Sequence, residues 1–243
     1  MVRVKQRTAL FLTLLACSAG FACGGGDPAT VASGAASEEY FPLVEGATWT
    51  YALGGMLVGE VEVVARGLRP VRGLEDPVFI MDEVSEAGRA VGIADVAPVG
   101  YVRVEQYLGR YLGLDYVEEE IRLLGGEDPV RFLPVDPVSV TQWEEENRIF
   151  ELPDGGGGVR RWAYAVRGVP SLEVPAGTFR DVIVVESQYW DEAVSEGPVL
   201  RFEDYYGRGV GLLRTVTYDE QNEGRISVEQ NLLRYAFPVS PDA

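Results

Sequence analysis

Short runs in which apolar and polar residues alternate fill most of the chain, and they constrain the fold more than any other feature. One such run is Arg161–Arg167. Its alternate residues Trp162, Tyr164 and Val166 fall on one face of an extended strand. Comparable runs are Glu60–Val63, Gly100–Tyr107, Asp181–Tyr189, Leu212–Tyr218 and Arg225–Tyr235. Turn-forming residues separate the runs, and no long stretch has the helical period. The pattern predicts an all-β, mainly antiparallel domain, either a curved sheet or half-barrel or a sandwich.

A single domain over residues 38–243 is expected to hold these runs. About 200 residues are enough for one core that buries roughly 70% of the unfolded surface, and no second linker interrupts them. The 14 prolines and 29 glycines fit turn-rich β structure better than a helical bundle. The best helical candidate in the domain is Tyr116–Leu124, which has three apolar residues at helical spacing.

Residues 1–22 have the pattern of a secretory signal peptide. Three cations lie within the first seven residues, and an uncharged apolar run follows from Thr8 to Ala22. This run is shorter than the roughly 20 residues that a membrane span needs. Glycines follow it instead of a cationic stop-transfer cluster. We therefore expect a signal helix that is removed on export.

The only two cysteines, Cys17 and Cys23, indicate the type of signal. A disulfide-stabilised domain would place its cysteines within the fold. Lipid attachment instead needs a cysteine directly after a small residue and an uncharged stretch, and an alanine precedes each of these two. We favour Cys23 as the lipidated first residue of the mature chain, because a glycine-rich segment starts directly after it. Lipidation of Cys17 is one alternative, since a leucine lies three residues before it, but its apolar run would then reach only from Thr8 to Ala16. An ordinary secreted protein with a Cys17–Cys23 disulfide is the other, and its loop would be too small to stabilise much.

Residues 23–37 are expected to be a tether between the lipid and the domain. After the cysteine the segment holds only Gly, Ala, Ser, Asp, Pro, Thr and Val, and as a flexible coil it would span about 20 Å r.m.s.. Several acyl chains on Cys23 would anchor the protein stably to a membrane. Gly24 stands where an aspartate would favour retention in the inner membrane, so in a Gram-negative cell we expect the outer membrane.

The chain is strongly acidic. Removal of the signal leaves 18 basic and 38 acidic residues, a net charge of −20. Nucleic acid is excluded as a partner, because its binding needs a basic surface. Electrostatic attachment to anionic lipid headgroups is disfavoured for the same reason. The charge suits a soluble domain beside a negatively charged envelope, and binding of a divalent cation or cationic ligand is the sharper alternative.

Two absences restrict the chemistry further. The chain has no histidine, and its only lysine, Lys5, lies in the signal. If Cys23 carries lipid, no free thiol remains. Ser-His and Cys-His catalysis, Schiff bases, and zinc or iron sites built on histidine or cysteine are therefore excluded. We predict no cofactor, no metal site, no catalytic residue and a protein that is not an enzyme.

Acidic clusters leave two alternatives open. The densest lie at Asp115–Glu120, Glu144–Glu146 and Glu203–Asp204, and none has the spacing of an EF-hand calcium loop. A calcium-stabilised surface module is one alternative, although solvated acidic surfaces are the simpler interpretation. A carboxylate-dependent hydrolase, similar to a glycosidase, is the other. It needs two acids about 5–9 Å apart in a cleft, one of them with a raised pKa.

Aromatic residues at strand spacing form the candidate binding site, and they are Tyr101, Tyr107, Tyr111, Trp143 and Trp162. Such side chains could line a cleft for an apolar ligand or a glycan. They could equally belong to the core, where aromatic residues of strands more often lie. A concave sheet face of about 300 Å³ or more would support a ligand carrier, whereas a fully packed interior would leave a structural role.

Four segments resemble a group of uncharacterised bacterial lipoproteins. Tyr40–Tyr51 is similar to the Y-F-P-L-x-x-G-x-x-W-x-Y segment that opens their domain. Val174–Phe179 closely matches their V-P-A-G-T-F turn. Two weaker matches follow the same order, Leu133–Pro137 with Trp143 and then Tyr205–Leu212 with its G-V-G-L end. The resemblance implies a β-rich envelope domain and brings no catalytic residues.

These observations predict a lipid-anchored envelope protein with a binding or structural role. Its expected partners are the membrane, through the anchor, and an apolar ligand, a glycan or another envelope protein. Half-barrel periplasmic lipoprotein carriers offer an architectural analogy for ligand binding on a curved sheet, and an analogy of fold does not establish function.

Overall fold

The structure, a computed structural model, describes residues 37–85, 96–111, 113–117, 119–123, 129–134, 136–137, 140–148, 159–191 and 195–239. These residues confirm the predicted all-β, antiparallel fold, and the alternating runs named above all lie in strands apart from one turn. One short helix, α1 (Ser37–Tyr40), precedes the strands. The large sheet consists of β1 (Thr48–Gly55), β2 (Gly59–Arg69), β3 (Val78–Ser85), β4 (Val96–Val104), β5 (Tyr107–Tyr111), β8 (Val130–Pro134), β9 (Gln142–Arg148), β10 (Val159–Val174), β11 (Gly177–Asp191), β12 (Leu200–Gly207), β13 (Gly211–Asp219) and β14 (Arg225–Ala236).

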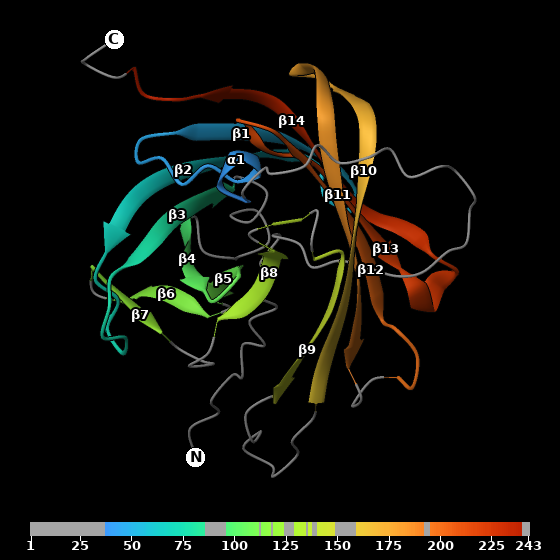
Figure 1. The fold of residues 1–243 in the computed structure, drawn as a ribbon, viewed down its shortest axis with the longest axis horizontal. Coiled ribbons are helices and arrows are strands. Elements are labelled where there is room, and N and C mark those ends of the chain that lie inside the picture. The colour runs from blue at the N-terminus through green and yellow to red at the C-terminus, as the bar shows by residue number, and fades with distance from the viewer. Residues whose placement is uncertain are drawn as a thin grey trace, which may run out of the picture.

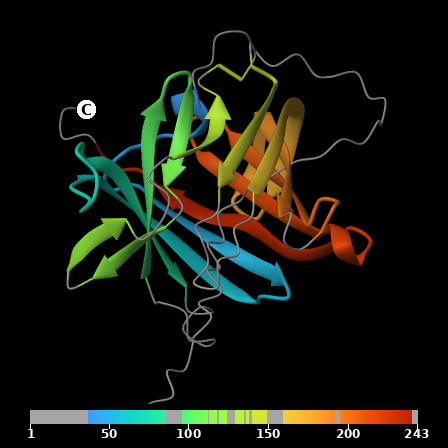
Figure 2. The same ribbon diagram turned by 90° about the horizontal axis from the view of Figure 1, so that it is seen from below.

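The twelve strands follow one another around a curled sheet in the order β8-β5-β4-β3-β2-β1-β14-β13-β12-β11-β10-β9. β1 pairs with β14, so β8 and β9 become the two edges. The sheet curls until these edges meet (Figure 1 and Figure 2). There the Trp143 indole N–H on β9 donates to the Arg131 carbonyl on β8 at 3.2 Å. The fold is therefore a barrel-like curved sheet with a seam between β8 and β9.

The helix expected at Tyr116–Leu124 is wrong. β6 (Leu114–Val117) and β7 (Glu120–Leu123) form a hairpin there, with Glu119 in the left-handed region at the turn. The hairpin packs on the outside of the large sheet, where Leu114 and Ile121 are buried. Leu114 lies opposite Leu123 and Tyr116 lies opposite Ile121, so the segment pairs with itself as two antiparallel strands instead of forming one helix. The expected run Gly100–Tyr107 is also broken, by a turn between β4 and β5.

The inner face of the sheet holds the main core, which is rich in aromatic side chains. Trp162 and Tyr164 point into it from alternate positions of β10, as predicted. The long β10–β11 hairpin bends over one end of the barrel, and the Ala176 N–H in its turn donates to the Leu232 carbonyl of β14. Gly177 in that turn has a φ of +136°, which glycine adopts without strain.

The predicted signal helix, Cys17, Cys23 and nearly all of the tether lie outside the described residues. Within the part of the chain that the structure describes, no helix is long and apolar enough to cross a membrane.

Candidate functional site

The candidate site is a small cavity at the end of the barrel where β1 and β13 begin, which we call the mouth. Its volume is about 20 Å³, roughly the space of one water molecule. The lining is almost entirely apolar and consists of Phe41, Pro42, Trp49, Tyr51, Val63, Met81, Tyr101, Gly211 and Leu212. Six of these nine residues belong to the segments Tyr40–Tyr51 and Tyr205–Leu212, so segments far apart in the sequence meet here.

Side chains of β1 hold the backbone of the β12–β13 turn at the mouth. The Trp49 indole N–H donates to the Val210 carbonyl at 2.6 Å, and the Tyr51 hydroxyl donates to the Leu212 carbonyl at 3.1 Å. Gly211 lies against the Trp49 indole with a φ of +102°, where a side chain would be strained. These contacts join the W-x-Y segment of β1 to the G-V-G-L segment at the start of β13.

Phe41 closes the mouth. Its ring lies 4.9 Å from the Tyr101 ring, 5.3 Å from Phe132 and 6.1 Å from Tyr206, and it is 5% exposed. The preceding helix α1 is fixed by the Gly209 N–H, which donates to the carbonyl of Glu39. The start of the domain therefore acts as a plug that fills this end of the barrel.

Two opposite charges are buried inside the barrel close to the mouth. Glu83 on β3 and Arg110 on β5 are 7% and 2% exposed. Burial raises the pKa of the Glu83 carboxyl from 4.5 to about 7, and the Arg110 charge opposes this rise. Glu83 Oε1 accepts no hydrogen bond from any residue that the structure describes. A buried carboxyl with an unused acceptor is costly when ionised, so Glu83 is easily protonated.

A second buried carboxylate, Asp204 on β12, accepts a hydrogen bond from Thr215 Oγ1 at 2.7 Å. Burial raises the pKa of Tyr51 well above its ordinary value, and Tyr101, Glu83 and Asp204 raise it further. Tyr51 therefore keeps its proton and remains a hydrogen-bond donor to the backbone.

Glu83 and Asp204, the two acids buried inside the barrel, do not form the cleft that a glycosidase-like hydrolase needs. Glu83 and Asp204 are absent from the lining of the mouth cavity, and core side chains enclose both. The raised pKa of Glu83 meets one requirement of that mechanism. The other requirement, access of a substrate to the two acids, is not met. Sequence reasoning did not single out Glu83 or Arg110. The signal available was charge within two otherwise apolar strands, Asp82 and Glu83 in VFIMDEV and Arg110 in YLGRY.

The five predicted binding residues do not gather at one place. Tyr101 lines the mouth cavity, and Tyr111 packs in the second core under the β6–β7 hairpin. Tyr107 and Trp143 lie at the seam, with their rings 5.7 Å apart. Trp162 lies further along the inner face.

The seam residues continue into a row of stacked aromatic rings. The Trp143 ring lies parallel to the Tyr164 ring at 4.5 Å, and the Trp162 ring lies 4.3 Å from the Tyr189 ring. Trp143 and Trp162 are both 9% exposed, and Tyr164 is 3% exposed. The rings bury one another, so most of their surface serves as core and little is left for a ligand.

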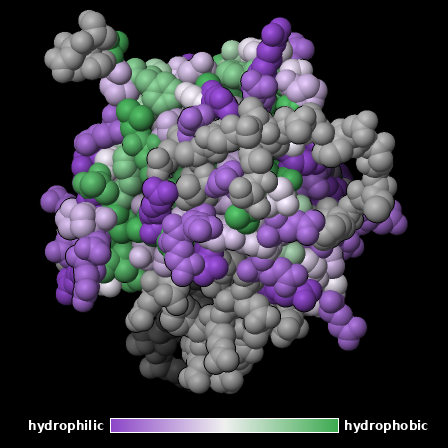
Figure 3. Space-filling view, viewed as in Figure 1, coloured by the Kyte–Doolittle hydropathy of each residue, from purple (hydrophilic) through white to green (hydrophobic). Residues whose placement is uncertain are grey.

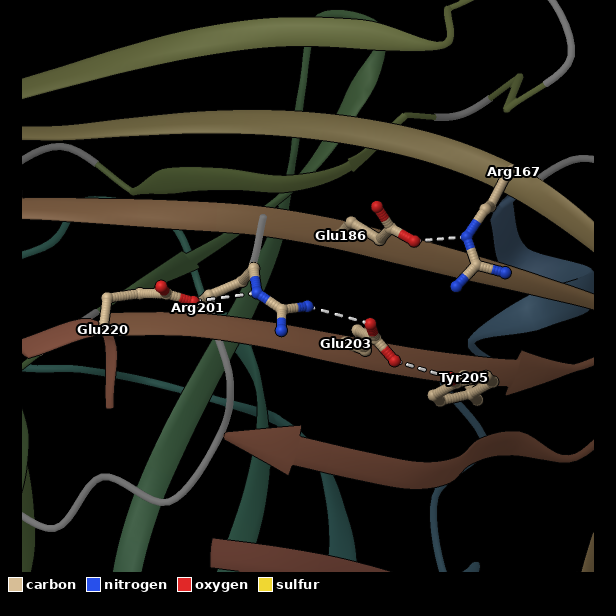
Figure 4. Close-up of polar contacts among 6 residues, drawn as sticks. All are labelled: Arg167, Glu186, Arg201, Glu203, Tyr205 and Glu220. Carbon is tan, nitrogen blue, oxygen red and sulfur yellow. Dashed lines mark hydrogen bonds and ion pairs between the residues drawn. The ribbon is translucent and has the colours of Figure 1, made fainter. Parts of the chain in front are cut away.

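The outer face of the same sheet carries a polar network, drawn in Figure 4, that consists of Arg167, Glu186, Arg201, Glu203, Tyr205 and Glu220. Arg201 bonds to Glu203 at 3.0 Å and to Glu220 at 2.9 Å. Glu203 and Asp204, neighbours in an acidic cluster, thus point to opposite faces: Glu203 meets Arg201 outside, and Asp204 meets Thr215 inside. Among the described residues no three Asp, Glu, His or Cys side chains are placed to hold a metal ion.

No protein-family model matches the chain, and no curated protein matches it. Two solved structures are similar to it. One, from Bacteroides fragilis, is provisionally named as an exported protein with a YmcC-like fold; it is 11% identical, with a TM-score of 0.40. The other, from Parabacteroides distasonis, is provisionally named as a lipoprotein; it is 12% identical, with a TM-score of 0.41. Each comparison covers 81% of this chain and 98% of the other. At these identities and TM-scores the likeness carries no argument about function.

Proposed function

We propose that the chain is a lipid-anchored envelope protein without catalytic activity, whose domain acts through its outer surface on the membrane and on other envelope proteins. The observation that carries the non-carrier part of this proposal is the small size of the mouth cavity among the residues that the structure describes. The mouth cavity of about 20 Å³ is far below the roughly 300 Å³ at which pockets for small ligands begin.

The packing of Phe41 supports the same conclusion. A carrier of an apolar ligand would need an open mouth, whereas here the Phe41 ring contacts Tyr101, Phe132 and Tyr206. At the seam the aromatic rings likewise pack against one another and leave little of their surface for a ligand. Both features support a scaffold role over the carrier interpretation of the curved sheet.

Native mass spectrometry of the full chain, extracted from its own membrane in detergent, tests the proposal. We expect a mature chain that starts at Cys23, carries acyl chains and holds no small molecule in stoichiometric amount. Cys23→Ser should abolish processing and acylation, whereas the matched variant Cys17→Ser should leave both intact. Acylation that depends on Cys17 would assign the lipid to Cys17 instead of Cys23. A chain in which both cysteines are unmodified would contradict the lipid anchor. A lipid or glycan retained at one copy per chain would contradict the non-carrier role.

A further inference from the structure

Apolar side chains gather on the surface beside the mouth, in a set that we call the mouth-rim patch: Val44, Phe179, Tyr235, Phe237, Pro238 and Val239. Val44 and Tyr235 are each 39% exposed, and Val239 is 88% exposed. In Figure 3 green hydrophobic atoms gather at the upper left, over the end of β14 and the adjoining ends of β1 and β2.

The patch is continuous. The Phe179 ring lies 6.2 Å from the Tyr235 ring, which lies 6.0 Å from the Phe237 ring. On the other side Pro238 packs against Gly46, two residues after Val44. A Cβ added to Gly46 would lie 3.7 Å from Pro238 Cγ. Phe237 also contacts Trp49, so the patch joins the wall of the mouth cavity.

We propose that the mouth-rim patch rests on the bilayer that holds the lipid on Cys23, so that the mouth faces the membrane. This inference rests on the proposed function. The described chain starts at Ser37 in α1, at the mouth, only seven residues before Val44. A tether that spans about 20 Å r.m.s. therefore joins the domain at the end that carries the patch. Tyrosine, phenylalanine and proline beside water suit the interface of a bilayer, where aromatic side chains are enriched.

The charges around the patch permit this contact. Arg69 pairs with Glu45 at 3.0 Å, Arg234 with Glu60 at 3.6 Å, and Arg208 with Glu39 at 3.3 Å. These pairs offset the charges of Glu39, Glu45 and Glu60 around the patch, although the mature chain carries a net charge of −20. Apolar contact with a zwitterionic lipid surface would meet little electrostatic repulsion there.

A second exposed apolar site provides the control. Met56 and Val58, in the turn between β1 and β2, are 76% and 80% exposed. Met56 lies seven positions after Trp49 along β1 and its turn, which corresponds to roughly 23 Å at the usual rise per residue of a strand. This turn lies at the opposite end of the barrel and should face away from the membrane.

The test uses the full, acylated chain reconstituted in phosphatidylcholine vesicles that contain a nitroxide-labelled lipid. Val239→Cys and Tyr235→Cys are each labelled with a polarity-sensitive fluorophore, and Met56→Cys is the matched control. We expect the labels at 239 and 235 to emit at shorter wavelength than in detergent-free buffer and to lose most of their emission to the quencher. The label at 56 should keep the emission of a label in water.

Each outcome distinguishes the two proposals. Water-like emission at 239 and 235 on an acylated chain overturns the membrane contact and leaves the anchor intact. Quenching of the label at 56 instead of the label at 239 would show that the opposite end of the barrel faces the bilayer, and it would also overturn the proposed membrane contact. Labelling of the parent chain, which has no cysteine but those in its amino-terminal region, would reveal a free Cys23 and thereby contradict the proposed function itself.

Discussion

The inner face of this one sheet and the part of its outer face that the β6–β7 hairpin leaves uncovered treat charged side chains in opposite ways. On the inner face Glu83 and Arg110 are almost fully buried, and burial raises the pKa of Glu83 to about 7. On the outer face the Arg167 side chain, which bonds to Glu186, is 42% exposed. Coulomb attraction is weakly screened inside and strongly screened outside. The two faces therefore differ in what a charge does: inside it couples stability to pH, and outside it adds little stability.

The difference extends to packing. The inner face holds interlocked aromatic rings around Phe41 and Trp143, so the loss of one ring there leaves a void. The outer face is covered in part by the β6–β7 hairpin, which the Tyr116 hydroxyl fixes to Asp82 at 2.8 Å, and otherwise by charged side chains that solvent reaches. Three substitutions test this contrast, from the largest expected effect to the smallest.

Phe41→Ala should have the largest effect. Removal of a buried phenylalanine ring leaves a cavity and typically costs about 3–5 kcal/mol of unfolding free energy. The measurement is urea unfolding, followed by tryptophan fluorescence and circular dichroism. Tyr235→Ala, at the exposed rim, is the matched control and should cost far less. A loss below about 1 kcal/mol for Phe41→Ala would mean that the mouth is open in solution, and it would restore the carrier interpretation.

Glu83→Gln should change how stability depends on pH. The folded pKa of about 7 lies above the ordinary 4.5, so the folded chain binds this proton more tightly than the unfolded chain does. The contribution of Glu83 is therefore fully present below pH 4.5 and is lost as pH rises through 7. At 1.36 kcal/mol per unit, the wild type should lose about 3 kcal/mol relative to the Gln variant between about pH 4 and 8.

The control for this pH effect is Glu186→Gln, which also removes one carboxylate but on the outer face. Between about pH 4 and 8, the Glu186→Gln variant should lose nearly as much unfolding free energy as the wild type does. If Glu83→Gln and Glu186→Gln have the same pH profile, Glu83 is not enclosed as the structure places it. Chemical unfolding at closely spaced pH values measures both variants on the same scale.

Sequence patterns predicted the strands because alternation reports directly on which face is buried. Trp162 and Tyr164 illustrate this, since both point inward as expected. The helix at Tyr116–Leu124 failed because its apolar residues are too few to separate a period of 3.6 from a period of 2. The pairing of β1 with β14, which joins the first and last strands of the chain within the sheet, links residues more than 170 positions apart, and no local pattern records it.

The candidate site was predicted less well than the fold. Aromatic spacing identified Tyr101 at the mouth, but it also selected Tyr111, which lies in the second core. Strand alternation gives the face on which a residue lies and not its neighbours on distant strands. Glu83 and Arg110 come together only through the pairing of β3, β4 and β5, and their burial depends on the curl of the whole sheet.

Arg167→Gln should have the smallest effect, since its bond to Glu186 is made at a partly exposed site. Pairs of this kind contribute about 0.2–1 kcal/mol and weaken as salt rises. A double-mutant cycle with Glu186→Gln isolates the pair from other consequences of either change. Coupling below about 1 kcal/mol that falls further in 1 M salt fits a screened outer face. Coupling above about 2 kcal/mol that resists salt would show that the outer network is shielded from solvent in the folded protein, and the contrast between the faces would then rest on packing alone.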